Sequence, residues 1–415
     1  MIFDICILFL YLDPIHDTIY SIQFKNQVLQ VFISDLLIIL ITAFIGRLLA
    51  KKIKQPMVLA DLIVGLILGN LGIIELSETM HNIADIGVLL LLFSTGLAVN
   101  LNELKELAKT STVVALLGVM IPFILGFFAA HLFGYSYLVS IFVGTSLTAT
   151  SIGISSQVLT ETKMIGMKIG TLIIGAAIID DVIGIIAMGT VVGIAVTGNL
   201  EIASLLISIV LTITFIVICL TLAIYFFQAI SNSFIFTQIG NYQILLPILI
   251  IGLIFAIIAE KIGLSLITGT FMAGLILGQT RLSKEAFESV SLIGHSFFIP
   301  IFFVTMGMQF DLSTFFSMGF FALVFIFLAI VGKIIGCGSG AKVCGFSFRE
   351  SLAVGIATVP RAEVALILAN IGLKYNVITP NIASTVIAMT MVTTLITPTL
   401  LKFSIEHLNK KKKHK

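Results

Sequence analysis

The sequence predicts an all-α polytopic membrane protein with about 13 transmembrane helices, arranged as two inverted six-helix repeats. Two observations carry this fold class: the composition is too apolar for a soluble domain, and two motifs recur at one offset. Hydrophobic residues make up 59% of the 415 residues and charged residues only 11%, with a mean hydropathy of +1.18. A soluble domain carries about 25% charged residues. The chain is therefore expected to lie in lipid.

Thirteen stretches are apolar enough to cross a bilayer, which takes about 20 helical residues. Residues 1–30 form an expected N-terminal extracytoplasmic segment, without the basic leading region of a signal peptide. The first repeat covers 31–198, a connecting span lies in 199–230, the second repeat covers 243–403, and 404–415 is a basic cytoplasmic tail. The expected spans are 31–49, 57–75, 82–100, 111–133, 138–158, 166–197, 202–228, 243–260, 264–279, 290–310, 315–337, 350–372 and 382–403.

The basic residues indicate the orientation of the chain. The loop that holds Lys51 and Lys52, and every second loop after it, account for 18 of the 23 Lys and Arg residues, with Arg47, Lys402 and the tail included. Lys and Arg concentrate in the cytoplasmic loops of membrane proteins. This pattern predicts a protein of the cell membrane with its N-terminus outside and its C-terminus in the cytoplasm.

Two motifs indicate an internal repeat. Gly65-Leu-Ile-Leu-Gly69 in the second expected span recurs as Gly274-Leu-Ile-Leu-Gly278 in the ninth. Phe93-Ser-Thr-Gly-Leu and Phe303-Val-Thr-Met-Gly-Met recur at nearly the same offset. One match could arise by chance in a Leu-rich chain, whereas two matches in spans of opposite direction predict an inverted repeat. Transporters with such repeats bind substrate where the halves meet.

The fifth and twelfth spans are expected to break within the membrane. Residues 144–153 are dense in hydroxyl groups, and the matching residues 355–363 contain Pro360, which removes a backbone donor and disfavours the preceding turn. Non-helical backbone at that depth is tolerated where protein buries it or where it lines a wet cavity. For the first stretch alone, a packing face of small residues is an equal alternative. The candidate cation ligands here are Thr148, Thr150 and Ser151.

The strongest functional signal is the adjacent pair Asp180 and Asp181, in the apolar run 173–186. A charge at the centre of a spanning helix costs about 2.5–3.5 kcal/mol, and neighbouring carboxylates also repel each other. A short acidic turn is the alternative, but no cluster of Gly, Pro and Asn flanks the pair. Ionisable groups in the membrane usually mark an ion or proton pathway. We therefore expect Asp180 and Asp181 to lie on the pathway of an ion or a proton.

Other buried charges complete the candidate set. Lys333 lies too deep in the eleventh span to reach the surface and is expected to need a carboxylate partner. Arg361 and Glu363 flank the break in the twelfth span, where an ion pair or capping of the broken ends is favoured over transported charge. Asp61 either lines an inner funnel or lies at the membrane surface. The four cysteines show no CxxC spacing, so no metal centre, disulfide or cofactor is expected.

Together, Thr148-Ala-Thr-Ser151, Asp180-Asp181, Lys333 and Pro360-Arg-Ala-Glu363 resemble the two-aspartate branch of the monovalent cation:proton antiporters, over residues 30–403. The resemblance implies a mobile core domain and a dimerisation domain, with spans 1, 2, 7, 8 and 9 as the fixed scaffold of a homodimer. It also implies that Asp181 is the main cation ligand and proton carrier, with Na⁺ held at Asp181 and Asp180. Asp180 would alternate between Lys333 and the ion, and exchange would be electrogenic.

The expected function is secondary active exchange of Na⁺ or Li⁺ for protons by elevator-like alternating access. A potassium/proton antiporter or potassium efflux system is the main alternative. A cation channel or a sodium-coupled organic-anion symporter fits less well, because the polar groups concentrate at one depth instead of lining a continuous pore or a roomy cavity. No enzymatic activity and no nucleic-acid partner are expected; the partners are monovalent cations, protons, membrane lipid and a second copy of the chain.

Overall fold

Helices make up the regular structure of this chain. Within the residues described by the computed structural model no strand occurs, which confirms the predicted all-α class. Residues 1–28 of the expected N-terminal segment, and residues 226–243, which include the whole loop after the seventh span, lie outside that description. The described residues are 29–74, 76–197, 202–225, 244–262, 264–313, 319–361 and 363–412.

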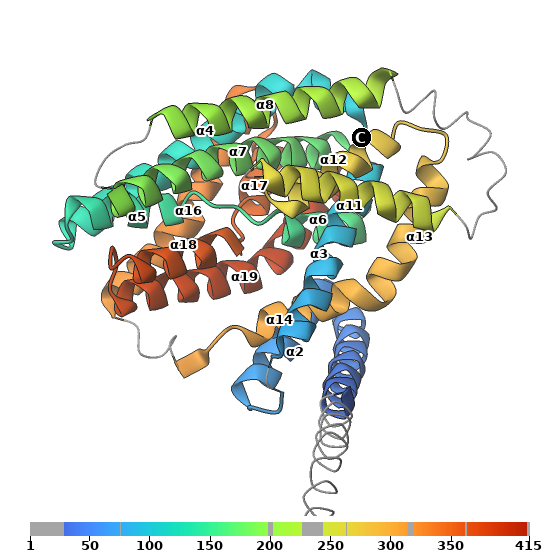
Figure 1. The fold of residues 1–415 in the computed structure, drawn as a ribbon, viewed down its shortest axis with the longest axis horizontal. Helices are drawn as coiled ribbons and strands as arrows, with labels where there is room; N and C mark the ends of the chain where they lie inside the picture. The colour runs from blue at the N-terminus through green and yellow to red at the C-terminus, as the bar shows by residue number, and fades with distance from the viewer. Residues whose placement is uncertain are drawn as a thin grey trace, which may run out of the picture.

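Each described helix overlaps one of the expected spans, and Figure 1 shows how the helices are arranged. The first half of the chain contains an N-terminal helix Leu29–Lys52, α2 (Met57–Asn70), α3 (Glu78–Ala98), α4 (Leu101–Leu132), α5 (Tyr137–Ser146), α6 (Ile152–Glu161), α7 (Lys168–Thr197) and α8 (Ile202–Tyr225). The second half contains α11 (Leu245–Lys261), α12 (Leu266–Leu277), α13 (Ser283–Ile293), the π-helix η1 (Gly294–Phe298), α14 (Ile299–Met308), α16 (Phe320–Val343), α17 (Phe348–Ala357), α18 (Glu363–Lys374) and α19 (Pro380–Lys412).

Six helical stretches of the described chain are long and apolar enough to cross a membrane on their own. The helices of several other spans, such as α2, α5 and α12, are shorter, and crossing by all thirteen spans stays a prediction. The six stretches are Leu29–Lys52, Glu78–Ala98, Leu101–Leu132, Ser283–Met308, Phe320–Val343 and Pro380–Leu408.

Several helices extend beyond the limits that hydropathy predicts. α4 begins about ten residues early because the Asn100 side chain accepts hydrogen bonds from the amides of Asn102 and Glu103, at 2.9 and 3.4 Å. α16 continues to Val343, and α19 continues through most of the basic tail. Lys105 and Lys342, which we expected in loops, therefore lie on helix ends. Hydropathy predicts which part of a helix lies in lipid, whereas capping contacts influence the residue at which the helix begins or ends.

The tenth span is continuous from Ser283 to Met308 but contains a π-helical turn at Gly294–Phe298. The Ile299 amide donates to Gly294 O, five residues back. The next residue is Pro300, which has no N–H to offer to His295 O. Nη1 of Arg47 donates to that carbonyl instead, at 2.9 Å. A side chain of the N-terminal helix thus satisfies the carbonyl that the π-turn leaves open.

The repeated motifs pack against each other across the two halves of the chain. α2 packs on α14 and α12 packs on α3, and Figure 1 shows α2 beside α14. A methyl group on Gly65 would overlap the Val304 carbonyl of α14, and one on Gly274 would overlap the Phe93 carbonyl of α3. Small residues allow such close backbone contact between helices in a membrane. Each Gly-Leu-Ile-Leu-Gly motif therefore lies against the Phe-containing motif of the other half.

The interrupted spans lie among the long helices of the chain. α5 packs on α4 and α17 packs on α16, while α4 also packs on α16 and α7. α19 packs on both α17 and α18.

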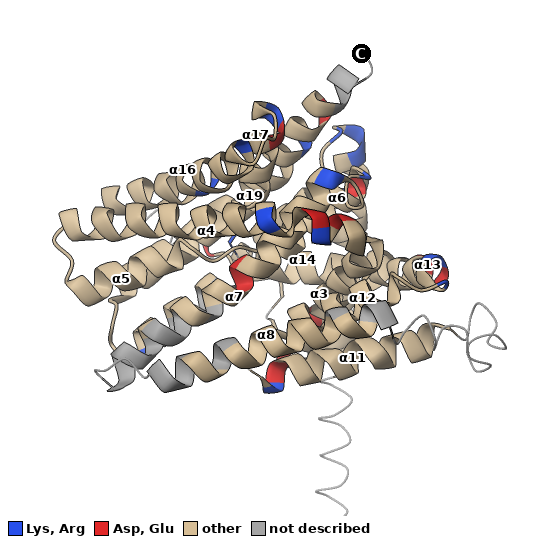
Figure 2. Cartoon of the chain, turned by 90° about the horizontal axis from the view of Figure 1, so that it is seen from above, with Lys and Arg blue, Asp and Glu red and all other residues tan. Residues whose placement is uncertain are grey.

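Charged side chains are distributed unevenly around this arrangement. Figure 2 shows Lys and Arg gathered around α6, α13 and α17, while the opposite end, at α5, is largely uncharged.

Candidate cation-binding site

Both spans that we expected to break are interrupted, and the two interruptions touch. α5 ends at Ser146 and α6 begins at Ile152, while α17 ends at Ala357 and α18 begins at Glu363. The Ser151 amide donates to Pro360 O at 2.8 Å. One extended segment thus satisfies a backbone group of the other, as buried non-helical backbone requires. The pairing brings residues about 200 positions apart into one site.

The protein itself uses some of the hydroxyl groups at the breaks. Thr148 Oγ1 donates to Thr145 O at 2.7 Å, and Thr358 Oγ1 donates to Gly355 O at 2.9 Å. Thr150 Oγ1 differs, because it is buried and has no hydrogen-bond partner among the described residues. A buried hydroxyl without a partner is costly unless a ligand or water completes it. Thr150 is thus a predicted ligand whose hydroxyl is open to a cation or water, while the Thr148 oxygen, although it donates its hydrogen, keeps its lone pairs for a cation.

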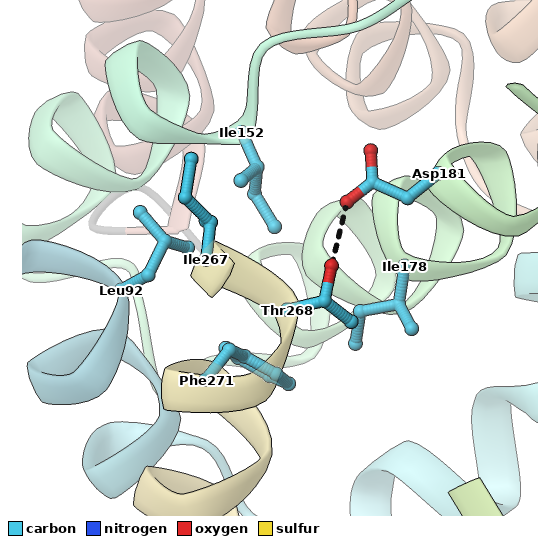
Figure 3. A pocket seen from close by; sticks show the side chains of 7 residues that line it. All are labelled: Leu92, Ile152, Ile178, Asp181, Ile267, Thr268 and Phe271. Carbon is cyan, nitrogen blue, oxygen red and sulfur yellow. Dashed lines mark hydrogen bonds between the residues drawn. The ribbon is translucent and has the colours of Figure 1, made fainter. Parts of the chain in front are cut away.

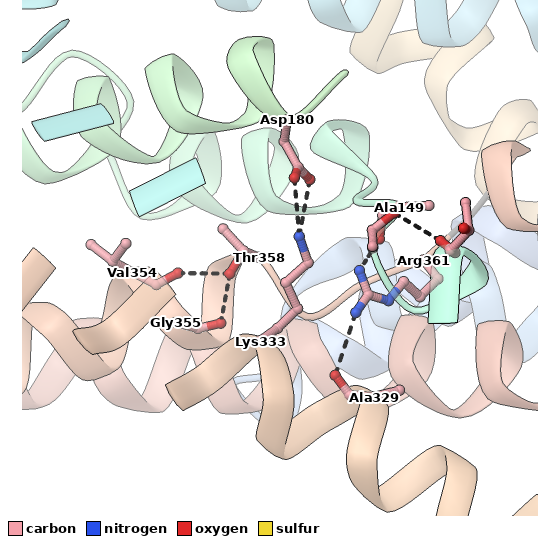
Figure 4. Close-up of polar contacts among 10 residues, drawn as sticks. Ala149, Asp180, Ala329, Lys333, Val354, Gly355, Thr358 and Arg361 are labelled. Atoms are coloured by element: carbon pink, nitrogen blue, oxygen red, sulfur yellow. Dashed lines mark hydrogen bonds and ion pairs between the residues drawn. The ribbon is translucent and has the colours of Figure 1, made fainter. Parts of the chain in front are cut away.

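Arg361 connects the two breaks to the surrounding helices (Figure 4). Its fully buried guanidinium donates to the carbonyl of Ala149 and, at 3.4 Å, to that of Ala329 on α16. On α19, Thr393 Oγ1 accepts from the Arg361 amide at 3.3 Å, and Thr394 Oγ1 donates to the Arg361 carbonyl at 2.7 Å. Arg361 therefore caps a carbonyl of the opposite break. The Glu363 side chain lies outside the described part of the structure, so its ion pair with Arg361 stays a prediction.

Asp180 on α7 and Lys333 on α16 form a buried ion pair (Figure 4). Lys333 Nζ lies 3.0 Å from Oδ2 and 3.3 Å from Oδ1 of Asp180. Lys333 is 0% exposed and Asp180 is 6% exposed. Charges at such depth persist when they are paired and hydrogen-bonded. The structure thus brings together the lysine and the carboxylate that the sequence requires to be partners.

Asp181 points in a different direction from Asp180. Adjacent residues on an α-helix do not share a face, so α7 presents Asp180 to α16 and Asp181 to α12. Asp181 lines a cavity of about 10 Å³, which is room for about one water molecule. Thr268 Oγ1 of α12 donates to Asp181 Oδ2 there, at 3.4 Å (Figure 3). The remaining lining is apolar: Leu92, Ile152, Ile178, Ile267 and Phe271.

The site therefore has two carboxylates in unlike surroundings within one turn of α7. Asp180 is held by an ammonium group, while Asp181 faces a small cavity beside the first residue of α6, Ile152. Nothing in the sequence distinguishes Thr268, because a threonine in an apolar helix resembles many others in this chain. Only the fold brings it to Asp181, 87 positions away. The cavity suits a small cation or a water, and it is too small for an organic anion.

The chain matches the family model described as "Sodium/hydrogen exchanger, transmembrane" over residues 39–406. Among relatives, it is 33% identical to a Na⁺/H⁺ antiporter of Enterococcus hirae, with 90% of this chain and 97% of that protein covered. It is 31% identical to the Na⁺/H⁺-K⁺ antiporter GerN of Bacillus cereus, covering 90% and 96%. It is 32% identical to the high-affinity Na⁺/H⁺ antiporter NhaS3 of a Synechocystis strain, covering 80% and 73%.

The fold also matches a solved structure. The sodium proton antiporter MjNhaP1 of Methanocaldococcus jannaschii, determined at pH 8, superimposes with a TM-score of 0.67 at 20% identity. The match covers 90% of this chain and 99% of that one, so the likeness extends over the whole helical arrangement. The family model, the relatives and the fold agree, and the chain belongs to the sodium/hydrogen exchanger family of membrane antiporters.

Proposed function

We propose that this protein exchanges Na⁺ or Li⁺ for protons across the cell membrane as a transporter, not an enzyme. The observation that carries the proposal is the buried Lys333–Asp180 pair beside Asp181, at the meeting point of two interrupted helices. Asp181 is the main cation ligand and proton carrier in this proposal. Asp180 assists it, while Thr150 and the backbone of the α5–α6 break complete the ligand set. The names of the relatives from E. hirae and Synechocystis support the choice of sodium.

Exchange follows from competition for the same oxygens. Two carboxylates and an ammonium group in close proximity titrate as one coupled unit. A proton or a cation at Asp181 offsets the negative charge of that carboxylate, whereas an empty charged site is expensive to move through an apolar barrier. Only loaded forms cross cheaply, so cation transport in one direction requires proton transport in the other. Cation binding near Asp180 would weaken its bond to Lys333 and let the lysine release a second proton, which makes exchange electrogenic.

Alternating access is proposed to be elevator-like, with the interrupted helices in a core that moves against a scaffold. The reciprocal packing of Gly65 on α14 and Gly274 on α3 supports two related halves, since each repeated motif has the same kind of neighbour. The one-sided charge distribution in Figure 2 supports a cytoplasmic C-terminus and an N-terminus outside. A homodimer through the scaffold would hold the frame fixed.

Potassium is the second candidate cation. GerN, which is 31% identical to this chain, carries K⁺ as well as Na⁺ in its name. Carboxylate, hydroxyl and carbonyl oxygens are hard ligands that accept either ion. The choice between the ions depends on how far the cavity beside Asp181 opens when the cation enters.

The test is cation-induced dequenching of a pH-sensitive dye in proteoliposomes, screened with Li⁺, Na⁺, K⁺ and Rb⁺. The wild type is expected to respond to Na⁺ and Li⁺. Asp181→Asn keeps the side-chain volume but removes the titratable group, so we expect the response to vanish while the melting temperature in detergent changes little. Sodium-dependent proton flux in Asp181→Asn at the wild-type rate would contradict the assignment of Asp181, and a wild type silent toward every cation would contradict exchange itself.

A further inference from the structure

We propose that Thr268 is a cation ligand supplied by α12, which Asp181 engages in only one of the two transport states. The inference rests on the proposed function and deepens it. Thr268 Oγ1 lies 3.4 Å from Asp181 Oδ2, and the two residues provide the polar wall of the cavity in Figure 3. Thr268 is only 3% exposed, so its hydroxyl faces protein and this cavity.

A hydroxyl group suits every state of the carboxylate that faces it. It carries one donor and two acceptor lone pairs, and its hydrogen rotates freely. It donates to Asp181 Oδ2 in this structure, the contact that an ionised carboxylate would need. It accepts from a protonated Asp181, and it offers a lone pair to a cation that has displaced the proton. Proton and cation can therefore replace each other without leaving a buried polar atom unpaired, which is the condition for rapid exchange at a dry site.

The location of Thr268 makes its contact with Asp181 depend on the transport state. Asp180, Asp181 and Lys333 lie on α7 and α16, whereas Thr268 lies on α12, which packs on α3, α8 and α11. α12 is the ninth expected span, and together with α8 and α11 it belongs to the spans that we propose as the scaffold, whereas α3 does not. If α7 moves against the scaffold during exchange, Asp181 leaves Thr268 behind. The site then has one oxygen fewer in the other state, so its cation affinity differs between the two faces of the membrane.

Thr270 provides a matched control on the same helix. It is also 3% exposed, but its hydroxyl donates to carbonyls of its own helix, to Ile267 O at 2.9 Å and to Leu266 O at 3.3 Å. Thr268→Val and Thr270→Val remove the same atom from the same depth of α12. They differ in whether the lost hydroxyl faced Asp181. Thr268→Ser keeps the hydroxyl and removes only a methyl group.

The experiment measures the apparent KM for Na⁺ in right-side-out and in everted membrane vesicles that contain each full-length variant. Thr268→Val is expected to raise KM about tenfold on one face, the loss of one hydrogen bond to a charged group, with no change on the other face. Thr268→Ser and Thr270→Val should behave as the wild type. A second readout is the rise in melting temperature on adding Na⁺ in detergent, which reports binding without transport and should shrink in Thr268→Val alone.

An unchanged KM for Thr268→Val on both faces, an equal rise on both faces, or an equal effect of Thr270→Val would overturn the inference. Failure here is distinct from failure of the proposed function. If the wild type exchanges Na⁺ for protons and Asp181→Asn does not, the function holds whatever Thr268→Val does. A Thr268→Val variant that melts without added cation as the wild type does, yet needs more Na⁺ for the same thermal shift, supports the ligand role independently of flux.

Discussion

Two buried carboxylates of this protein form ion pairs with basic side chains of different types. Asp180 accepts from the single ammonium group of Lys333, at 3.0 and 3.3 Å. Asp61, on α2, accepts from the guanidinium of Arg47: Nε lies 2.9 and 3.0 Å from its two oxygens, and Nη2 lies 2.6 Å from Oδ2. Asp61 is 0% and Asp180 is 6% exposed, so burial is similar and the nature of the partner differs.

The chemistry of the partner determines whether the pair can change. A guanidinium is a planar fork that matches a carboxylate and keeps its charge at any pH a protein experiences. Arg47 also donates to His295 O at the π-turn, so it ties the N-terminal helix and α2 to the tenth span. An ammonium group is compact, rotates, and can lose its proton. We infer that the Arg47 pair fixes one part of the molecule, while the Lys333 pair lies where charge is exchanged.

The comparison predicts that Lys333→Gln causes the largest loss of folding stability. Removing the lysine strands Asp180 as a buried charge, at a cost of about 3–5 kcal/mol of folding stability. Asp180→Asn in the same background should recover much of that loss, because it removes the stranded charge. A cycle of melting temperatures in detergent over the wild type, both single variants and the double variant measures the coupling between the two residues.

Transport current on a solid-supported membrane completes that test. If Lys333 supplies one of two exchanged protons, the double variant either exchanges without net charge movement or does not exchange. Additive losses of stability across the cycle, together with a full sodium-driven current in the double variant, would exclude both the pairing energy and the proton role.

Arg47→Gln should cause the next largest loss of folding stability and should leave transport unchanged. It strands Asp61, but 18% of the Arg47 side chain is exposed, so water compensates part of the loss and we expect about 3 kcal/mol. His295 O also loses its donor. The apparent KM for Na⁺ and the reversal potential should stay as in the wild type, which proteoliposomes at graded sodium gradients would measure. A changed charge stoichiometry in Arg47→Gln would remove the distinction between the two pairs.

The comparison also separates what the sequence could predict from what it could not. A lysine in an apolar span needs a carboxylate, and the chain offers a pair of them at Asp180 and Asp181, so the cost of a buried charge predicts that Lys333 contacts one of the two. The family resemblance implied that this partner is Asp180. The helix breaks follow from Pro360 and from the hydroxyl-rich partner stretch. These predictions rest on local chemistry with few possible partners.

Other contacts depend on the three-dimensional packing and have no local signal. The sequence identifies Arg47 only as one of the basic residues of the cytoplasmic side, and it is equally compatible with Asp61 in an inner funnel or at the membrane surface. The fold pairs the two side chains. The donation from Arg361 to Ala149 O requires the register of two breaks 212 residues apart. Thr268 meets Asp181 because α12 packs where it does. Such contacts are determined by which helices touch, and hydropathy does not specify that.

Replacing lysine by arginine and arginine by lysine tests the difference between the two ion pairs with the smallest change to each. Arg47→Lys keeps the charge but loses the fork, so we expect a loss of only about 1 kcal/mol of stability and unchanged transport. Lys333→Arg also keeps the charge and a hydrogen bond to Asp180, yet a guanidinium does not release its proton. The reversal potential of Lys333→Arg should therefore move toward that of an electroneutral exchanger, even where its melting temperature stays close to the wild type.

The informative quantity is thus a difference between two conservative variants. If Lys333 acts only as a structural counter-charge, as Arg47 does, Lys333→Arg and Arg47→Lys should both keep the wild-type reversal potential and differ only in stability. If Lys333 carries a proton, only Lys333→Arg changes the number of charges moved for each sodium. The same preparations serve for both variants, so an error in protein amount or vesicle volume affects them equally, and the reversal potential itself is independent of how many molecules are active.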